Sequence, residues 1–169
     1  MPELTQTPSH LQGKNLPQVT HMRNAPMPLD LDWVASVQAN TSAIERRAAT
    51  IGGRRTVKKD YQAAWLCKAI SLIDLTTLSG DDTAGRVQRL CAKARQPVAP
   101  HMLDALGMGG LTVGAVCVYH DMVETAVRAL EGSNIPVAAV STGFPAGLSP
   151  LHLRIAEIGE SVLAGAREI

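Results

Sequence analysis

The sequence is poor in aromatic side chains, since Phe, Trp and Tyr together make up 3% of its 169 residues. Hydrophobic residues nevertheless make up 46% of the chain, so a core must be built from Val, Ile, Leu, Ala and Met. Aliphatic, β-branched interiors are typical of buried parallel strands, which read as short apolar runs. The composition therefore favours one globular α/β domain and excludes a largely disordered chain.

The sequence also lacks an excess of charge of one sign, and its formal net charge is +1. Such a chain has no overall field that would attract nucleic acid or an anionic membrane. No apolar run approaches the ~20 residues needed to span a bilayer. The N-terminus has no basic segment followed by an apolar one, as a secretory signal would. We therefore expect a cytoplasmic protein with neither a nucleic-acid nor a membrane partner.

Paired cysteines are absent as well. Cys67, Cys91 and Cys117 form no CxxC pair and have no histidine at a spacing suited to zinc. Their odd number and apolar settings predict free thiols in a reducing compartment. The cysteines therefore predict neither a disulfide nor a metal site.

The beginning of the chain differs from the rest in composition. Residues 1–28 are rich in Pro, Thr, Gln, Asn and His and have little periodic apolar signal, which predicts a disordered leader. Residues 29–68 predict an N-terminal helical extension. Its first helix carries Trp33 and is capped by an acidic residue, its second spans about Thr41–Ile51, and its third lies near Tyr61–Ala69.

This helical extension contains a basic cluster. The cluster could be a nucleic-acid or nuclear-import patch, or the solvated face of two helices. The solvated face is favoured, because Glu45 and Asp60 interrupt the basic residues and no aromatic stacking platform accompanies them. The cluster consists of Arg46, Arg47, Arg54, Arg55, Lys58 and Lys59.

From Ala69 onward, short apolar runs alternate with helical patterns. The runs predict three strands, at Ala69–Ile73, Val113–Tyr119 and Pro136–Ser141. Each is followed by a predicted helix, the first running through Val87 and Cys91 with Asp81 or Asp82 as its cap, the second over Met122–Leu130 and the third over Leu151–Ala164.

Three strand–helix units in series predict parallel strands joined by right-handed crossovers. The final Arg167-Glu168-Ile169 is expected to begin a fourth strand. A (β/α)₈ barrel usually needs ~250 residues. We therefore expect residues 69–169 to form a partial β/α barrel and the chain to be incomplete.

In parallel α/β folds, working residues lie at the carboxyl ends of the strands. The three predicted ends carry Asp74 with Thr76, then Cys117 with Tyr119, and then the Gly143–Gly147 loop. Each feature also has a purely structural explanation: Asp74 as a local cap, Cys117 as a small buried hydrophobe, and the loop as a packed turn. Composition alone does not choose between these explanations.

Three motifs taken together, in this order and spacing, closely resemble the first three strands of the deoxyribose-phosphate aldolase family. The motifs are Ile73-Asp74-Leu75-Thr76-Thr77-Leu78, Ala115-Val116-Cys117-Val118-Tyr119 and Gly143-Phe144-Pro145-Ala146-Gly147. The resemblance runs from about Leu29 to Ile169. The segments Arg55–Lys59, Gln62–Leu66 and Ser79–Thr83 are similar to the longer, animal-type branch of that family.

The resemblance implies a TIM-type barrel that needs no metal and no cofactor. It implies the reversible aldol cleavage of 2-deoxyribose 5-phosphate to glyceraldehyde 3-phosphate and acetaldehyde, through a lysine Schiff base. It also implies phosphosugar and aldehyde partners and leaves a homo-oligomer possible. The substrate-pocket residues that it implies are Asp74, Thr76, Leu78, Cys117 and Phe144.

The resemblance implies catalytic residues that this sequence does not contain. The Schiff-base lysine, a second lysine and a proton-transfer aspartate are expected beyond Ile169, so the 169-residue chain is expected to be inactive alone. None of its own lysines is predicted to end a strand. A further departure is His120, which stands where the family commonly has proline after Tyr119. The five lysines are Lys14, Lys58, Lys59, Lys68 and Lys93.

Two other functions remain open. One is a non-catalytic assembly module that pairs through the open edge of its sheet. The other is a small α/β domain with a nucleotide site, which is disfavoured because neither a Walker-type loop nor a GxGxxG motif follows a predicted strand.

Overall fold

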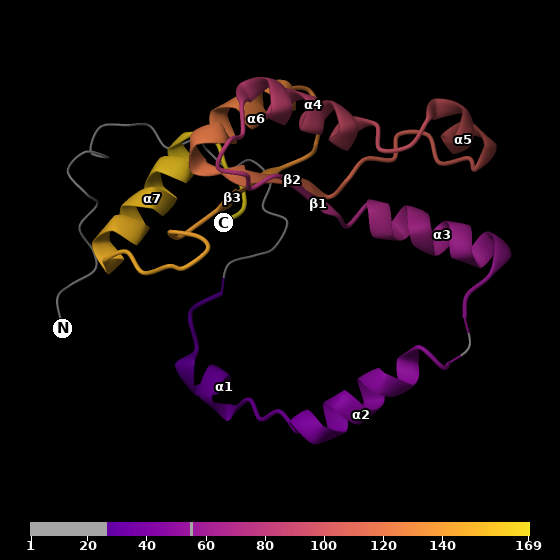
Figure 1. Ribbon diagram of the computed structural model, residues 1–169, viewed down its shortest axis with the longest axis horizontal. Coiled ribbons are helices and arrows are strands. Elements are labelled where there is room, and N and C mark those ends of the chain that lie inside the picture. The colour runs from indigo at the N-terminus through magenta and orange to yellow at the C-terminus, as the bar shows by residue number, and fades with distance from the viewer. Residues whose placement is uncertain (1–26, 55) are drawn as a thin grey trace. The chain divides into compact units, whose positions relative to one another are not determined.

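The computed structural model describes residues 27–54 and 56–169 (Figure 1). All but the last two residues of the predicted leader 1–28 therefore lie outside the described residues, as do Lys14 and Arg55. The chain divides into two compact units. The described residues of one run from Met27 to Ala63, and the other runs from Ala64 to Ile169.

Three helices precede the sheet in the chain, as the sequence predicts: α1 (Leu31–Ser36), α2 (Thr41–Ile51) and α3 (Lys59–Ile70). Asp30 caps α1, its carboxylate accepting from the Trp33 N–H at 2.9 Å, and the side-chain amide oxygen of Asn40 caps α2 by accepting from the Ala43 N–H at 3.0 Å. Neither α1 nor α2 contains a buried residue. The described members of the basic cluster are all exposed, which agrees with a solvated helix face.

The sheet has three parallel strands in the order β1 (Asp74–Thr76), β2 (Ala115–Tyr119) and β3 (Val137–Val140). Glu168 then forms a parallel bridge with Ala138 on the far side of β3. Two backbone bonds hold this bridge, from Ala139 N to Glu168 O and from Arg167 N to Val137 O, each of 2.9 Å. Glu168 thus pairs with β3 at the position where the sequence predicts the beginning of a fourth strand.

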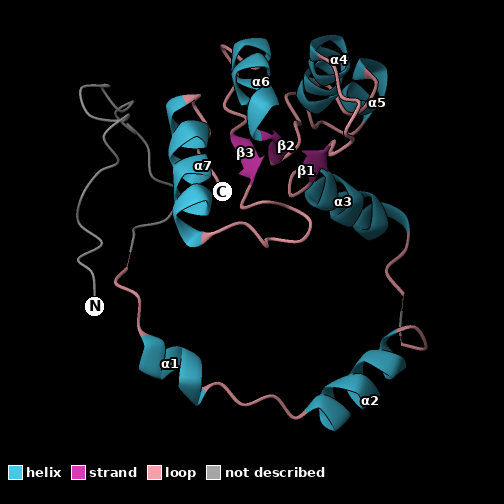
Figure 2. Ribbon diagram, turned by 60° about the vertical axis from the view of Figure 1, so that its left-hand side comes forward, coloured by secondary structure: helices cyan, strands magenta, loops and turns pink. Residues whose placement is uncertain are grey.

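Helices separate the strands: α4 (Ala84–Arg95) and α5 (Pro100–Ala105) follow β1, η2 (His120–Met122) and α6 (Val123–Ala129) follow β2, and α7 (Leu151–Leu163) follows β3. Figures 1 and 2 show α4 and α6 over the same face of the sheet. Parallel strands joined by helices confirm the α/β fold class.

The core lies between α4, α6 and the sheet. It consists largely of small aliphatic side chains, as the shortage of aromatics requires. Its fully buried members include Val87 and Cys91 from α4, Val116 and Val118 from β2, and Val123 and Ala126 from α6.

Two local predictions are wrong. The first strand is not Ala69–Ile73: α3 continues to Ile70, and the strand begins at Asp74. The cap of α4 is neither Asp81 nor Asp82 but Thr83, whose hydroxyl accepts from the Arg86 N–H at 3.3 Å. The aspartates are occupied elsewhere, as described below.

Within residues 27–54 and 56–169, no helix combines the length and the apolar character that crossing a membrane requires.

Candidate functional site

The two faces of the sheet differ in their side chains. Successive residues of a strand point to opposite faces. One face carries Val116, Val118, Val137 and Ala139, all part of the core beneath α4 and α6. The opposite face therefore carries the alternate residues of the strands, among them Asp74, Thr76, Cys117 and Tyr119.

Three of the predicted pocket residues meet on that second face. Thr76 and Cys117 are partners in the register between β1 and β2, and Asp74 lies two residues before Thr76. Asp74 and Thr76 are exposed, whereas Cys117 is half-buried. The Thr76 hydroxyl donates to the Asp74 carbonyl oxygen at 2.9 Å. A carboxylate, a hydroxyl and a thiol thus line one open patch of the sheet.

The surroundings of Cys117 shift the pKa of its thiol. Burial, the largest cause, raises the pKa of Cys117 above its usual value of 9.0. A hydrogen bond with Thr76 acts in the opposite direction, and the charge of Asp74 adds to the rise. Cys117 therefore stays a neutral thiol near pH 7 and does not present a thiolate nucleophile.

The loop after β1 is folded around Asp82, whose side chain is only 4% exposed. Its carboxylate accepts from the Thr77 hydroxyl at 2.9 Å and from the Ser79 N–H at 3.0 Å. Arg86 donates to Asp82 at 3.2 Å and to Asp81 at 2.9 Å. The loop thereby fixes the chain directly after the Asp74–Thr76 patch.

These contacts shift the carboxyl groups. Burial would raise the pKa of Asp82, but hydrogen bonds from Thr77, Ser79 and Arg86 outweigh it and leave that pKa lowered. Arg86 and then Ser79 lower the pKa of Asp81 to about 2. Both carboxylates are therefore ionised near pH 7.

The loop after β3 bears Phe144, a predicted pocket residue that is 47% exposed. Its ring lies 6.4 Å from that of Tyr119, centroid to centroid, at an interplanar angle of 55°. Tyr119 is on the same face of β2 as Cys117. Phe144 therefore lies at the carboxyl-terminal end of the patch.

Glu157 of α7 holds this loop. Its carboxylate accepts from the Gly143 N–H at 2.9 and 3.2 Å, and it lies 3.5 Å from Nδ1 of His120. The sequence reasoning missed Glu157 and the contact of its carboxylate with His120, which is itself an exposed residue. The contacts join positions 14 residues apart or more, so no local signal could have identified them.

The five predicted pocket residues are thus not equally placed. Asp74, Thr76 and Cys117 come together, and Phe144 joins them through Tyr119. Leu78 is half-buried in the loop after β1, and no described contact joins it to the other four.

No lysine in the described residues lies on a strand or directly after one. Lys58 and Lys59 precede or begin α3, Lys68 lies in α3 and Lys93 in the last turn of α4. Residues 27–54 and 56–169 also contain no group of three His, Cys, Asp or Glu side chains that could hold a metal ion.

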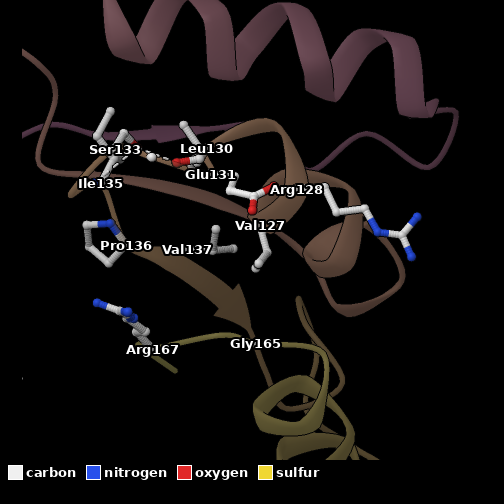
Figure 3. A pocket seen from close by; sticks show the side chains of 11 residues that line it. Val127, Arg128, Leu130, Glu131, Ser133, Ile135, Pro136, Val137, Gly165 and Arg167 are labelled. Carbon is white, nitrogen blue, oxygen red and sulfur yellow. Dashed lines mark hydrogen bonds between the residues drawn. The ribbon is translucent and has the colours of Figure 1, made fainter. Parts of the chain in front are cut away.

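A pocket of about 420 Å³ lies at the amino-terminal end of β3, away from the loop that carries Phe144 (Figure 3). It is lined by the end of α6, residues 130–133 and 135–137, Gly165 and Arg167. The guanidinium groups of Arg128 and Arg167 lie on opposite sides of it in Figure 3 and do not converge on one point. This pocket is separate from the Asp74–Thr76–Cys117 patch, and its side chains suggest no chemistry.

Known proteins give a specific comparison. The chain is 54% identical to human deoxyribose-phosphate aldolase and 55% identical to the mouse enzyme of that name, each over 145 residues. Each alignment covers 83% of this chain and 46% of the relative. The chain therefore spans less than half the length of these curated relatives.

A search against protein-family models gives no match. Among solved structures, the "crystal structure of a putative deoxyribose-phosphate aldolase from Coccidioides immitis" is similar, with a TM-score of 0.47 and 28% identity. That similarity covers 59% of this chain and 34% of the other. The sequence comparisons confirm the resemblance on which the predicted site rests.

Proposed function

We propose that this chain, which is similar in sequence to deoxyribose-phosphate aldolases over most of its length, supplies the first three β/α units of such an enzyme. The observation that carries the proposal is the 54–55% identity with the human and mouse proteins. The complete enzyme would cleave 2-deoxyribose 5-phosphate reversibly to glyceraldehyde 3-phosphate and acetaldehyde. Its partners would be these small molecules alone, in the cytoplasm.

The exposed sheet face supports a role in substrate binding. In a closed barrel, helices cover the outer face of the strands, and the other face turns inward. Here α4 and α6 cover one face, so Asp74 and Thr76, the first and last residues of β1, and Cys117, in the middle of β2, would point to the interior. Their role would be to orient a small polar substrate and to exclude water.

The chemistry needs an amine, and none of the lysines in residues 27–54 and 56–169 lies at a strand end. In a Schiff-base aldolase, a deprotonated lysine attacks the aldehyde carbonyl carbon, and water leaves as the iminium forms. The iminium then withdraws electrons from the adjacent carbon, so that a carbon–carbon bond can form or break. We therefore infer that the 169-residue chain is inactive alone.

The decisive experiment compares this chain with a chimera in which Ile169 is followed by the part of the human relative that lies beyond the aligned segment. Both are assayed for cleavage of 2-deoxyribose 5-phosphate, then treated with borohydride and acetaldehyde to trap a Schiff base. We expect cleavage and a lysine adduct in the chimera and neither in the short chain. An adduct on the short chain would show that one of its five lysines is a competent nucleophile.

The same experiment addresses the alternative assembly module. A folded chimera without cleavage, beside a short chain that forms a dimer of defined stoichiometry, would contradict the aldolase proposal and favour pairing through the sheet edge.

The sheet face is tested by Asp74→Ala in the chimera. Because Asp74 is exposed at the start of β1, we expect little change in stability. Loss of an orienting polar group should lower kcat/KM by about 10- to 100-fold. Lys93→Ala, on α4, is the matched control and should leave the rate unchanged. Equal rates for the two variants would place the substrate elsewhere.

A further inference from the structure

Glu157 joins three segments that are far apart in the sequence. It lies in the middle of α7 (Leu151–Leu163), and its carboxylate contacts the loop after β3 and the residue that follows β2. Its side chain is only 18% exposed. A carboxylate this far removed from water must keep its hydrogen bonds, because burying it without partners would cost free energy.

The loop that Glu157 holds is tightly closed. The Gly147 N–H donates to the Gly143 carbonyl oxygen at 2.8 Å. Gly143 has a φ of +67°, and a Cβ at that position would lie 3.3 Å from Oγ of Ser149. Gly143 therefore accepts neither a different backbone conformation nor a larger residue easily. The hydrogen bond from its N–H to Glu157 sets the position of the whole loop relative to α7.

Phe144 follows Gly143 directly, so the position of the Gly143 backbone determines where the Phe144 ring lies. The ring contacts Tyr119 and no other aromatic side chain in the described residues. With 47% of its surface exposed, Phe144 is not held in place by packing alone. The loop backbone, and hence the carboxylate that holds it, determines where the ring stands above the sheet face.

We propose that Glu157 is a positioning residue for the proposed aldehyde pocket: it fixes the Phe144 wall by accepting from the Gly143 N–H, and His120 shares its carboxylate. This inference rests on the proposed function for the identity of the pocket. The contacts that carry it do not depend on that function. Glu157 holds the loop because its side chain is long enough to bring an acceptor oxygen from α7 to the Gly143 N–H. This length, which we call its reach, is more important than its negative charge.

Two conservative variants separate reach from charge. Glu157→Asp keeps the charge but withdraws the carboxylate by one methylene. Glu157→Gln loses the charge but keeps an acceptor oxygen at the original distance. Glu124→Asp on α6 is the control, because Glu124 also forms an ion pair, with Arg128, but is 65% exposed and lies in a different helix from the loop contact.

Phe144 offers a clean probe, because it is the only Phe in the chain. Incorporation of 4-fluorophenylalanine gives one ¹⁹F signal that reports the position of this ring beside Tyr119. Amide exchange at Gly143 reports the hydrogen bond itself. Both measurements are made on the 169-residue chain and need no substrate.

We expect Glu157→Asp to shift the ¹⁹F signal toward that of a free ring and to accelerate exchange at Gly143 by about tenfold, the loss of one hydrogen bond. Glu157→Gln and Glu124→Asp should stay within about threefold of the parent chain. Unchanged Gly143 exchange in Glu157→Asp would overturn the proposal. An equal change in Glu157→Asp and Glu157→Gln would also overturn it, since the negative charge would then matter as much as the reach.

The chimera links this result to activity. There, Glu157→Asp should raise KM for 2-deoxyribose 5-phosphate more than it lowers kcat, because a displaced wall weakens binding without removing the nucleophile. A fall in kcat with KM unchanged would contradict a positioning role. An inactive parent chimera would count against the proposed function only, and the Gly143 and Phe144 measurements would still decide this inference.

Discussion

The loops after β1 and β3 are both held by a carboxylate that accepts from a backbone N–H, but the carboxylates come from different places. Asp82 lies in its own loop, three residues after the Ser79 N–H that it accepts. Glu157 lies in α7, 14 residues after Gly143. The first loop is therefore organised by local sequence, whereas the second takes its shape only when α7 packs beside it.

The two carboxylates also have different ionic surroundings. Asp82 shares Arg86 with Asp81, so that a permanent positive charge lies between two negative ones. The Glu157 carboxylate lies 3.5 Å from the His120 ring and accepts from the Gly143 N–H. The loop after β1 thus has a guanidinium as its ionic partner, and the loop after β3 is held by a backbone hydrogen bond.

The largest difference between the two loops is expected in the free energy of unfolding when a glycine of each loop is replaced by alanine. Gly143→Ala forces a side chain into a φ of +67° with Ser149 Oγ 3.3 Å away, whereas Gly80 has open space around its Cβ position and no positive φ. We expect Gly143→Ala to lower the free energy of unfolding by about 1–3 kcal/mol. Gly80→Ala should change it by no more than about 0.5 kcal/mol.

Urea unfolding of the two variants, at constant slope, measures this difference. Equal midpoints for Gly143→Ala and Gly80→Ala would mean that the loop after β3 is as free as the loop after β1, and the contrast between the two loops would be lost.

A smaller effect is expected from acid. The folded-state pKa of Asp81 is lowered to about 2 from 3.8, and that of Asp82 is lowered too. A lowered folded pKa adds stability above the unfolded value, and this stability is lost as the pH falls through the folded value. The melting temperature should therefore fall between about pH 4 and pH 2 as the contacts with Arg86 are lost.

Asp81→Asn should flatten part of this decline, because it removes one of the two shifted groups. The change should be modest, since the Asp81 side chain is 73% exposed. A decline in melting temperature that is just as steep in Asp81→Asn would assign the acid sensitivity to other carboxylates.

Much of the architecture could be predicted from the sequence. The runs around Val116 and Val137 are apolar, β-branched and bounded by turns, and they become β2 and β3. The first strand was misplaced because a short apolar run does not distinguish the last turn of a helix from a strand. Ala69 and Ile70 end α3, and the Ile73 carbonyl already accepts from Gly114 and Ala115 at the start of the sheet.

The site was predictable only in part. Strand alternation and parallel register place Asp74, Thr76 and Cys117 on one face of the sheet, although Asp74 begins β1 and does not end a strand. The cap of α4 was missed because Asp81, Asp82 and Thr83 are all good caps, and only the fold shows that the aspartates bind Thr77, Ser79 and Arg86. Glu157 was missed because its partners come from two other segments.

The order of the strands in space has a consequence for synthesis. Each strand pairs with the one before it in the chain, from β1 to β2, then β3, and then Glu168 beside Ala138. Within the described residues, β2 and β3 therefore each find a neighbouring strand that has already been made. As the chain leaves the ribosome at about 5–20 residues per second, the sheet can therefore grow from one edge, one β/α unit at a time.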